Sequence, residues 1–510
     1  MIRTGESFWV ASAAGQERYP ALAADDVRVD VAVIGGGIVG ITTALLLQRA
    51  GRSVALLEAA RLGRQVTGGS TAKITSQHGL VYAELIDKHG QEAARAYAES
   101  NQAGLEWICR EVREQSIDCD LERCPAYLYT AEEARVGDIE REAKAAASLG
   151  LPAHLEPGLD LPVGARAALR FDAQAQFHPV RYLDALAREL ASLGGRIHEH
   201  TRALDVERGD PVKVAAAAGC VHARDVVVAT HLPFLDRGGF FGRAFPYRHM
   251  CLAATIGADG FPPGMYLSLD QPTRSTRTTP DGDGGRVLIA AGESFPTGQE
   301  DSGALLENLE TYVRERFAAT DVRWRWGNQD YYSSDRLPWV GRILPGSSRI
   351  RVATGFSAWG ITAGTIAAQI LADDVLGREN PWASLYDARR TGLRHGGATI
   401  LKKNATVAGS WIAERLRSGA RRNAGTLRPG EGGLVRLDGR TVAAYRDPDG
   451  HLHALSPYCT HLGCELNWNA AELSWDCHCH GSRFDVEGSV LNGPAVRNLG
   501  RHEPPAEPAR

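Results

Sequence analysis

The sequence lacks an uninterrupted apolar run of the roughly 18 to 20 residues that a membrane-spanning helix needs. Residues 1–30 carry acidic and basic side chains throughout and lack the apolar core of a secretory signal peptide. Neither charge is in large excess, since the formal net charge is −4 at pH 7, so composition indicates neither nucleic acid nor another polyanion as a partner. These absences favour a cytoplasmic protein without a membrane span.

The length indicates more than one folded unit. The chain has 510 residues, whereas single hydrophobic cores stop growing near about 250 to 300 residues. Hydrophobic residues make up 44% and charged residues 23% of the chain, which is ordinary for soluble globular proteins and excludes wholesale disorder. We therefore expect two or three domains.

A glycine-rich turn lies between a strand pattern at 27–34 and a helix pattern at 41–50. Gly35, Gly37 and Gly40 have the G-x-G-x-x-G spacing of a dinucleotide site. Gly35 permits a tight turn, Gly37 lets the backbone approach a pyrophosphate, and Gly40 allows the helix to pack closely on the strand. The alternative is a glycine-rich turn in another kind of α/β protein.

A second strand pattern at 53–57 supports nucleotide binding, because it ends in Glu58, whose carboxylate can accept hydrogen bonds from an adenosine ribose. FAD and NAD both use this arrangement. The sequence shows no second strand–glycine–helix pattern, since Asp281–Gly285 is an acidic loop and Gly430–Gly433 follows a proline. A reductase that also binds NAD(P)H in its own domain would normally show two such patterns.

Several further segments resemble the D-amino-acid oxidase and glycine oxidase superfamily. These segments are residues 27–58, 67–78, 176–182, 226–230 and 353–364. In that superfamily FAD is bound by discontinuous segments and a separate sheet domain covers the flavin. The resemblance therefore implies an α/β, Rossmann-like flavin-binding domain with an interleaved α+β substrate domain.

The same resemblance implies further FAD contacts beyond the glycine-rich turn. They are Thr71, Ala72, Lys73, Ala203, Gly355, Gly360, Ile361 and Thr362. Residues 354–364 form a glycine-rich turn before an apolar helix predicted at 361–376, and a helix N-terminus stabilises negative charge on a reduced flavin. For Lys73, a solvated surface lysine is the alternative.

Four of the nine cysteines lie between residues 459 and 479, which indicates a metal site rather than a disulfide framework. The pairs Cys459-x-His461 and Cys477-x-x-His480 supply two thiolates and two imidazoles. A Rieske [2Fe–2S] centre uses this set, with both thiolates on one iron and both imidazoles on the other. A tetrahedral zinc site is the alternative. The other five cysteines show no ligand spacing.

Residues 425–500 resemble the Rieske proteins of quinol-oxidising respiratory complexes, through both cysteine–histidine boxes and Gly493-Pro494-Ala495. The resemblance implies a small all-β domain and a disulfide between Cys464 and Cys479. Zinc would not explain this second cysteine pair, nor Gly463, Gly481 and Ser482. The implied ligands of the cluster are Cys459, His461, Cys477 and His480.

We expect five regions along the chain. They are an N-terminal segment at 1–26, an FAD-dependent oxidoreductase at 27–390, a basic linker at 391–424, a Rieske domain at 425–503 and a tail at 504–510. Within the oxidoreductase, the FAD-binding part covers about 27–84, 166–234 and 326–378, and the substrate-covering sheet covers about 235–325. The linker is either a connector packed on the flavin domain or a basic docking face for an acidic partner.

The combination of cofactors suggests a protein that converts a two-electron oxidation into one-electron transfers. A flavin accepts a hydride from a C–H bond next to nitrogen or oxygen and can release electrons one at a time, whereas a Rieske cluster carries one electron. Two electrons would enter at FAD and leave singly through the cluster to an unidentified acceptor. Two alternatives stay open: an O2-using flavin amine oxidase with a structural or sensory cluster, and a non-catalytic redox sensor or electron carrier.

The substrate is indicated only by Asp330. Residues 333–341 match a superfamily segment that often has an arginine five residues before Asp335, where it binds an amino-acid carboxylate, and this chain has Asp330 there. An acid cannot bind a carboxylate in that way but can pair with a cationic amine, so we favour an amine. The alternative is that Asp330 bonds to backbone in a turn.

No strong catalytic base is evident from the sequence. Residues in segments that could face the flavin are Tyr247, His249, Asp330, Tyr331 and Tyr332. Hydride transfer from a neutral amine needs no strong base. His78 and His178 lie in superfamily-like motifs, where a lone histidine is more often a structural group.

We expect the reduction potential of the cluster to lie below that of quinol-oxidising Rieske proteins. His478 occupies a position that is usually proline, and Phe484 stands where high-potential members carry a tyrosine. Ser482 is kept, so one hydrogen bond toward a cluster sulfur can form while the phenolic bond is lost, and fewer such bonds stabilise the reduced cluster less. A redox titration measures the midpoint, and an equal or higher value would contradict this expectation.

Overall fold

The computed structural model describes most of the chain. It covers residues 4–502 except 14, 16, 25, 160, 258–260, 348, 392–395, 398 and 406–420. Much of the basic linker at 391–424 and the whole tail at 504–510 therefore lie outside the described residues, and the expectations for them stay predictions.

A mostly parallel sheet forms the nucleotide-binding part of the fold. Its strands are β1 (Val27–Ile34), β2 (Val54–Leu57), β7 (Arg196–His198), β8 (Ala203–Glu207), β9 (Val212–Ala216), β10 (Cys220–Val228), β16 (Trp339–Arg342) and β17 (Ile350–Thr354). The order is β16-β17-β10-β1-β2-β7, with β9 on β10 and β8 on β9. The second half of β1 is buried, as expected for a central parallel strand. This is the Rossmann-like domain that the resemblance implied.

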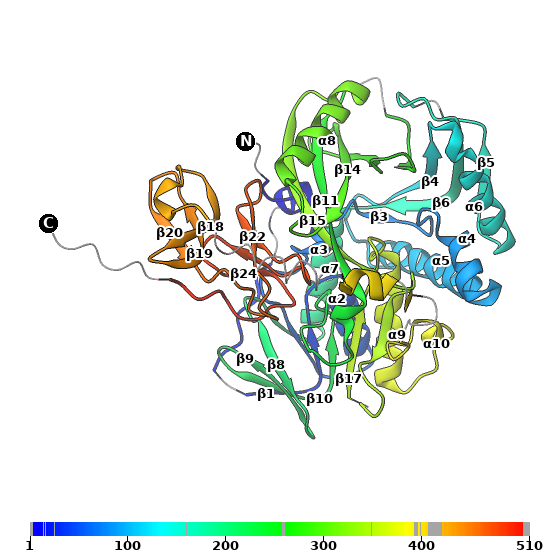
Figure 1. Ribbon diagram of the computed structural model, residues 1–510. Coiled ribbons are helices and arrows are strands. Elements are labelled where there is room, and N and C mark those ends of the chain that lie inside the picture. The colour runs from blue at the N-terminus through cyan, green and yellow to red at the C-terminus, as the bar shows by residue number, and fades with distance from the viewer. Residues whose placement is uncertain are drawn as a thin grey trace.

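A second sheet runs across the molecule above the first (Figure 1). Its strands are β3 (Lys73–Ile74), β4 (Glu122–Thr130), β5 (Ala153–Glu156), β6 (Ala167–Gln176), β11 (Ala244–Thr255), β12 (Met265–Ser268), β13 (Ser275–Pro280), β14 (Arg286–Pro296) and β15 (Val322–Ser333). The order is β15-β11-β14-β13-β12-β4-β6-β3, with β5 on β6. The sheet thus draws strands from well outside the expected range of about 235–325, because the chain crosses between the two sheets repeatedly.

Helices cover both sheets. They are α1 (Phe8–Ser12), α2 (Ile38–Arg49), α3 (Val66–Gly69), α4 (Val81–His89), α5 (Gln91–Glu114), α6 (Val136–Ser148), α7 (Pro179–Ser192), α8 (Ser302–Phe317), α9 (Thr362–Leu376) and α10 (Ala383–Tyr386). The apolar helices α2 and α9 pack against each other, and α8 lies on β11 and β14. Among the described residues, no helix has the length and apolar character to cross a membrane.

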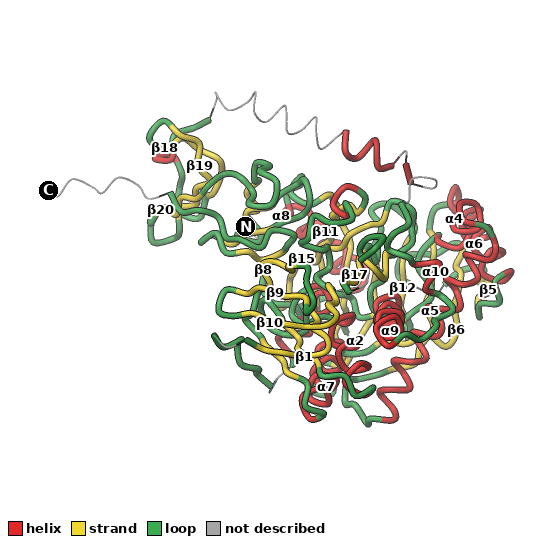
Figure 2. The backbone as a smooth tube through the Cα atoms, turned by 90° about the horizontal axis from the view of Figure 1, so that it is seen from below, coloured by secondary structure: helices red, strands yellow, loops and turns green. Residues whose placement is uncertain are grey.

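The C-terminal part consists of two small antiparallel sheets beside the large domain (Figures 1 and 2). One sheet contains β18 (Gly432–Leu437), β19 (Arg440–Arg446) and β20 (Leu452–Leu455). The other contains β21 (Asn467–Asn469), β22 (Ser474–Asp476), β23 (Arg483–Asp485) and β24 (Val490–Asn492), in that order. The expected small all-β domain is therefore present.

A buried ion network joins the all-β domain to the large domain. Arg248 on β11 pairs with Glu472, and Arg483 bonds to Glu472 at 2.7 Å and to Asp476 at 2.8 Å. All four side chains are at most 7% exposed. Although burial alone would raise it, Arg483 and Arg248 hold the pKa of Asp476 below its usual value. Gly327 makes room for the network, because a Cβ there would lie 2.2 Å from the Arg248 guanidinium.

We expect Arg248→Met to destabilise the attachment of the all-β domain. The substitution leaves two buried carboxylates with one arginine, and removing one partner of a buried ion pair costs about 3 kcal/mol or more. The measurement is the urea midpoint followed by cluster absorbance. Arg141→Met is the matched control, because Arg141 and Asp87 are both mostly exposed and such pairs contribute about 0 to 1 kcal/mol. Equal shifts in both variants would show that the network does not hold the domain.

Candidate functional site

A cavity of about 690 Å³ lies between the two large sheets and reaches from the glycine-rich turn to the start of α9. Most of the residues implied as FAD contacts line it: Gly35, Gly37, Glu58, Thr71, Ala72, Lys73, Ala203, Gly360, Ile361 and Thr362. Gly40 and Gly355 lie behind the wall instead. A Cβ at Gly355 would meet the Trp339 ring at 2.9 Å, and its φ is +78°, so it shapes the turn before α9.

The glycine-rich turn has the geometry that its spacing predicts. Gly35 has a φ of +111°, and a Cβ there would lie 2.3 Å from the Ala229 carbonyl oxygen. A Cβ at Gly40 would lie 1.8 Å from the Gly35 carbonyl oxygen, which explains the close packing of α2 on β1. α2 begins at Ile38, three residues earlier than expected from the pattern, with Gly37 as its N-cap. Its N-terminus therefore faces the cavity, where a pyrophosphate would gain from the helix dipole.

Glu58 is buried at the end of β2 and points toward the same turn. Its carboxylate accepts hydrogen bonds from the backbone N–H of Gly36 at 2.7 Å and of Ala60 at 2.8 Å. Burial raises the pKa of Glu58, and these two bonds act against that shift. A carboxylate has about four acceptor positions, so two remain for the hydroxyls of a ribose.

Lys73 lies in the cavity wall and is not a solvated surface lysine. Its ammonium donates to the Tyr266 carbonyl oxygen at 3.3 Å and to the Ser275 hydroxyl. Burial, together with the nearby Arg277, lowers the pKa of Lys73 to about 7. A group of this kind changes charge near physiological pH, which is typical of functional sites.

Asp330 lies on β15 within the cavity wall. Its carboxylate accepts from the backbone N–H of Tyr331 and of Ala358, both at 2.7 Å, and lies 3.2 Å from Nε2 of His231. Asp330 therefore bonds to backbone, which was the alternative interpretation of this residue. It does so from a strand rather than from a turn. Three of about four acceptor positions are taken, which leaves one directed elsewhere.

The other suggested catalytic residues divide into two groups. His249 and Tyr332 line the cavity, and burial lowers the pKa of His249 to about 4, so its ring is neutral at pH 7. Tyr247 does not line the cavity, and its hydroxyl accepts from Lys403 at 2.6 Å. Tyr331 lines the cavity with its ring, but its hydroxyl donates to the backbone oxygen of His480 at 2.8 Å.

His78 and His178 have structural roles. His78 lies 2.7 Å from the Tyr97 hydroxyl and 2.8 Å from the Thr75 carbonyl oxygen, so both ring nitrogens are engaged, although the ring also lines the cavity. His178 caps α7 by accepting from the backbone N–H of Arg181 at 3.2 Å.

The two cysteine–histidine boxes fold into matching loops. In the first loop the N–H of Gly463 donates to the Cys459 carbonyl oxygen at 3.0 Å. In the second loop the N–H of Gly481 donates to the Cys477 carbonyl oxygen, also at 3.0 Å. Both glycines have a positive φ, of +72° and +78°, which favours glycine at these turns. These turns explain Gly463 and Gly481, which a zinc site would not have explained.

The loops bring the four implied ligands together. The rings of His461 and His480 are 5.1 Å apart, and both thiols are buried. Hydrogen bonds from Cys477, from the backbone of His461 and Leu462, and from the Ser482 hydroxyl lower the pKa of Cys459 to about 7. The contact with Cys459 and burial raise the pKa of Cys477. Nδ1 of His480 is buried and has no hydrogen-bond partner among the described residues, as suits a metal ligand.

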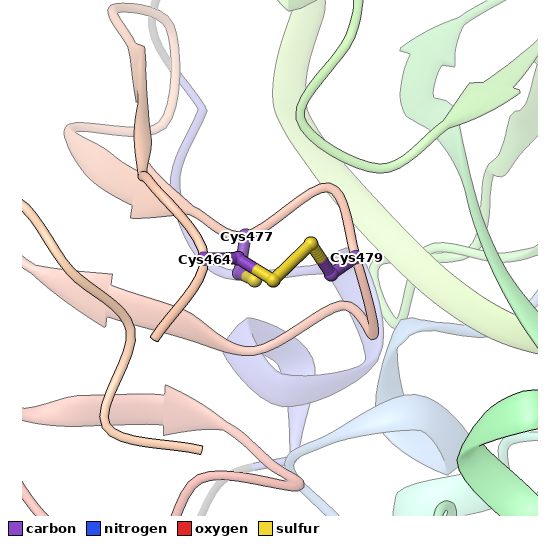
Figure 3. Close-up of side chains that lie close together, drawn as sticks. All are labelled: Cys464, Cys477 and Cys479. Atoms are coloured by element: carbon purple, nitrogen blue, oxygen red, sulfur yellow. A yellow bond between two sulfur atoms is a disulfide. The ribbon is translucent and has the colours of Figure 1, made fainter. Parts of the chain in front are cut away.

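A disulfide joins Cys464 and Cys479, the pair implied by the Rieske resemblance. Figure 3 shows Cys477 close to this disulfide. The three sulfur atoms lie within ligand distance of one another, but the two bonded to each other are not thiolates, so the trio is not a three-cysteine metal site. The disulfide instead ties the two ligand loops together.

The all-β domain contributes part of the cavity wall, which the sequence analysis missed. Residues 490–493, 495 and 496 line the same cavity as Glu58 and Lys73. The Arg202 guanidinium donates to the Val490 carbonyl oxygen at 2.9 Å, and the Asn492 amide donates to Gln65 at 3.2 Å. His231, Glu84 and Arg336 also line the cavity without having been singled out. Contacts between two domains leave no local pattern in the sequence. Gly493-Pro494-Ala495, within this segment, indicated only the Rieske domain.

Comparisons with known proteins agree with this arrangement. The family described as FAD dependent oxidoreductase matches residues 30–374, and the Rieske [2Fe-2S] domain matches residues 421–503. A Bacillus subtilis protein named as a Rieske 2Fe-2S iron-sulfur protein, YhfW, is 38% identical over 497 residues, which are 97% of each chain. Gamma-glutamylputrescine oxidoreductase of Escherichia coli is 24% identical over 398 residues, 73% of this chain and 89% of that one. Glycine oxidase from Geobacillus kaustophilus has a TM-score of 0.59 at 20% identity, over 71% of this chain and 99% of that one.

We expect Glu58→Ala to weaken FAD binding by about 30-fold, because hydrogen bonds to a charged group contribute roughly 2 kcal/mol. The measurement is titration of the FAD-depleted protein with FAD. Glu58→Gln, which keeps one acceptor oxygen, should have an intermediate effect. Glu99→Ala, on the exposed face of α5, is the control and should bind as the unchanged protein does. Unchanged FAD affinity in Glu58→Ala would exclude Glu58 from the site.

Proposed function

The chain belongs to the FAD dependent oxidoreductase family and carries a C-terminal Rieske [2Fe–2S] domain, and on this premise we propose that it oxidises a C–N bond and exports the electrons singly. FAD and the [2Fe–2S] cluster are its cofactors, and it is an enzyme of the amine and amino-acid oxidoreductase class. The finer proposal is a dehydrogenase-like reaction, in which a one-electron acceptor replaces O2.

The shared cavity wall carries this proposal. Residues 490–496 of the Rieske domain border the cavity that contains the implied FAD contacts, and Tyr331 reaches from that cavity to the backbone of the ligand His480. Electron transfer between cofactors falls off steeply with distance, so a cluster placed against the flavin cavity favours direct transfer. A structural or sensory cluster would not need this placement.

An amine, or an amino-acid-like molecule with a free amine, is the proposed substrate. Oxidation of its C–N bond to an imine releases two electrons and two protons, and FAD, when bound, accepts a hydride from the carbon next to nitrogen. Asp330 places negative charge in the wall, which favours a cationic amine over a carboxylate. His249 is neutral at pH 7 and adds no positive charge against it. One relative is named for an amine, gamma-glutamylputrescine, and one structural neighbour for glycine.

We propose that the electron acceptor is a small one-electron carrier. We also propose that the protein is located in the cytoplasm. Four buried cysteines, Cys109, Cys119, Cys124 and Cys251, are free thiols, as is usual where the surroundings are reducing. The disulfide between Cys464 and Cys479 is buried in the Rieske domain, where it is shielded from thiol exchange.

An anaerobic screen of amines tests the proposal, with flavin and cluster absorbance followed together. We expect a suitable amine to bleach the flavin first and the cluster afterwards, and the Rieske EPR signal to appear. Glycine and D-amino acids serve as the comparison, because Asp330 should disfavour a carboxylate next to the reacting carbon. The control is Cys459→Ser supplied with excess FAD, in which the flavin should still bleach but no cluster signal should appear.

Three outcomes would contradict the proposal. Reduction of the flavin by an amine with the cluster left oxidised, together with stoichiometric H2O2 in air, would show an oxidase with a structural or sensory cluster. No reduction by any amine would favour an electron carrier. Faster reduction by glycine or a D-amino acid than by amines would reject the substrate class.

A further inference from the structure

We propose that Tyr331 is a positioning residue that sets where electrons enter the Rieske cluster, on the side of His480 rather than of His461. The inference rests on the proposed transfer from flavin to cluster and adds its route. Tyr331 is buried on β15, in the wall between the FAD cavity and the second ligand loop.

The hydroxyl of Tyr331 holds the ligand loop from the flavin side. It donates to the His480 carbonyl oxygen at 2.8 Å and lies 3.3 Å from the Gly493 carbonyl oxygen. Gln329, two residues earlier on β15, donates to the Gly481 carbonyl oxygen at 2.9 Å and to the Tyr331 hydroxyl at 3.2 Å.

The large domain also packs tightly against Gly481, next to the ligand His480. A Cβ at Gly481 would lie 2.7 Å from both the Gln329 amide nitrogen and the Pro246 Cβ, and 2.9 Å from the Tyr331 hydroxyl. The large domain therefore packs directly on the backbone of the second loop. A side chain at position 481 would not fit between them.

The ring of Tyr331 also contacts another residue that lines the cavity. It lies edge-on to the His231 ring, with centroids 4.6 Å apart, and His231 is 3.2 Å from Asp330. His231 and Tyr331 both line the cavity. A continuous chain of contacts thus connects the cavity with the backbone of His480.

His461 faces a different environment. Its side chain is only 7% exposed, and its Nε2 lies 3.2 Å from Asp236 of the large domain, whose side chain is 64% exposed. The neighbouring Leu462 is 48% exposed. Phe241 lies edge-on to both ligand rings, at 5.3 Å from His480 and 6.0 Å from His461, so it does not distinguish them. The contrast is that Tyr331, which contacts the backbone of His480, lines the cavity, whereas Asp236, which contacts His461, does not.

Each transfer by this route moves one electron and makes no covalent bond. The reduced flavin is oxidised by one electron, the cluster is reduced by one, and a one-electron carrier reoxidises the cluster before the second transfer. Tyr331 itself is neither oxidised nor reduced and only fixes the contact.

The test compares Tyr331→Phe with the unchanged holoenzyme after anaerobic photoreduction of the flavin with a deazaflavin. No amine is needed, so the result does not depend on the substrate. We expect cluster bleaching to follow flavin reduction on the order of tenfold more slowly in the variant, because the hydrogen bond to His480 is lost. Tyr445→Phe is the matched control, since Tyr445 is buried in the Rieske domain against Trp468, away from the cavity, and should leave the rate unchanged.

Two further measurements distinguish the loss of the Tyr331 contact from damage to the cluster and from its direct reduction by deazaflavin. The dithionite-reduced Rieske EPR signal of Tyr331→Phe should match the unchanged protein in spin count, which shows that the cluster is intact. FAD-depleted protein gives the rate of direct reduction by deazaflavin, to be subtracted. If the unchanged protein transfers electrons from flavin to cluster and Tyr331→Phe does so at the same rate, the inference is overturned and the proposed function stands. Absence of transfer in the unchanged protein would overturn the proposed function itself.

Discussion

The arrangement of both sites depends on the buried pairing of Arg248 with Glu472, continued through Arg483 to Asp476. Four charges removed from water are tolerated only when each finds an opposite partner with good geometry. Glu472, Asp476 and Arg483 belong to the Rieske domain and Arg248 to the large domain, so the buried Arg248 finds its partner only when the domains are docked. A smaller or fully exposed interface would let the Rieske domain separate at little cost, and the cluster would then have no fixed relation to the flavin.

The network explains why neighbouring features are as they are. Gly327 on β15 has no side chain because the Arg248 guanidinium passes over it, and Gly481 has none because Gln329, Pro246 and Tyr331 close on it. β15 thus contributes to the substrate sheet, to the cavity wall and to the domain interface. Gln329 and Tyr331 bond to the Rieske domain, as the period of two in a strand allows, and Tyr331 also lines the cavity.

Much of the fold could be predicted from the sequence, because its signals are local. The G-x-G-x-x-G turn, the acid at the end of the second strand and the two cysteine–histidine boxes lie within short segments, and the family matches confirm FAD and the cluster. The extent of the second sheet could not be predicted, since β4 and β12 pair across more than a hundred residues. The role of Tyr331 was also missed: a tyrosine beside the cavity suggested a base, whereas its hydroxyl is used by a partner that only the domain interface supplies.

The segment 490–496 also links the loading of the two cofactors. It belongs to the Rieske domain, which also carries the two ligand loops, and it closes one wall of the FAD cavity. Because binding free energies are reciprocal, a cluster that stabilises this wall strengthens FAD retention, and bound FAD in turn favours the docked, cluster-bearing domain. We therefore expect loss of the cluster to weaken the retention of FAD as well.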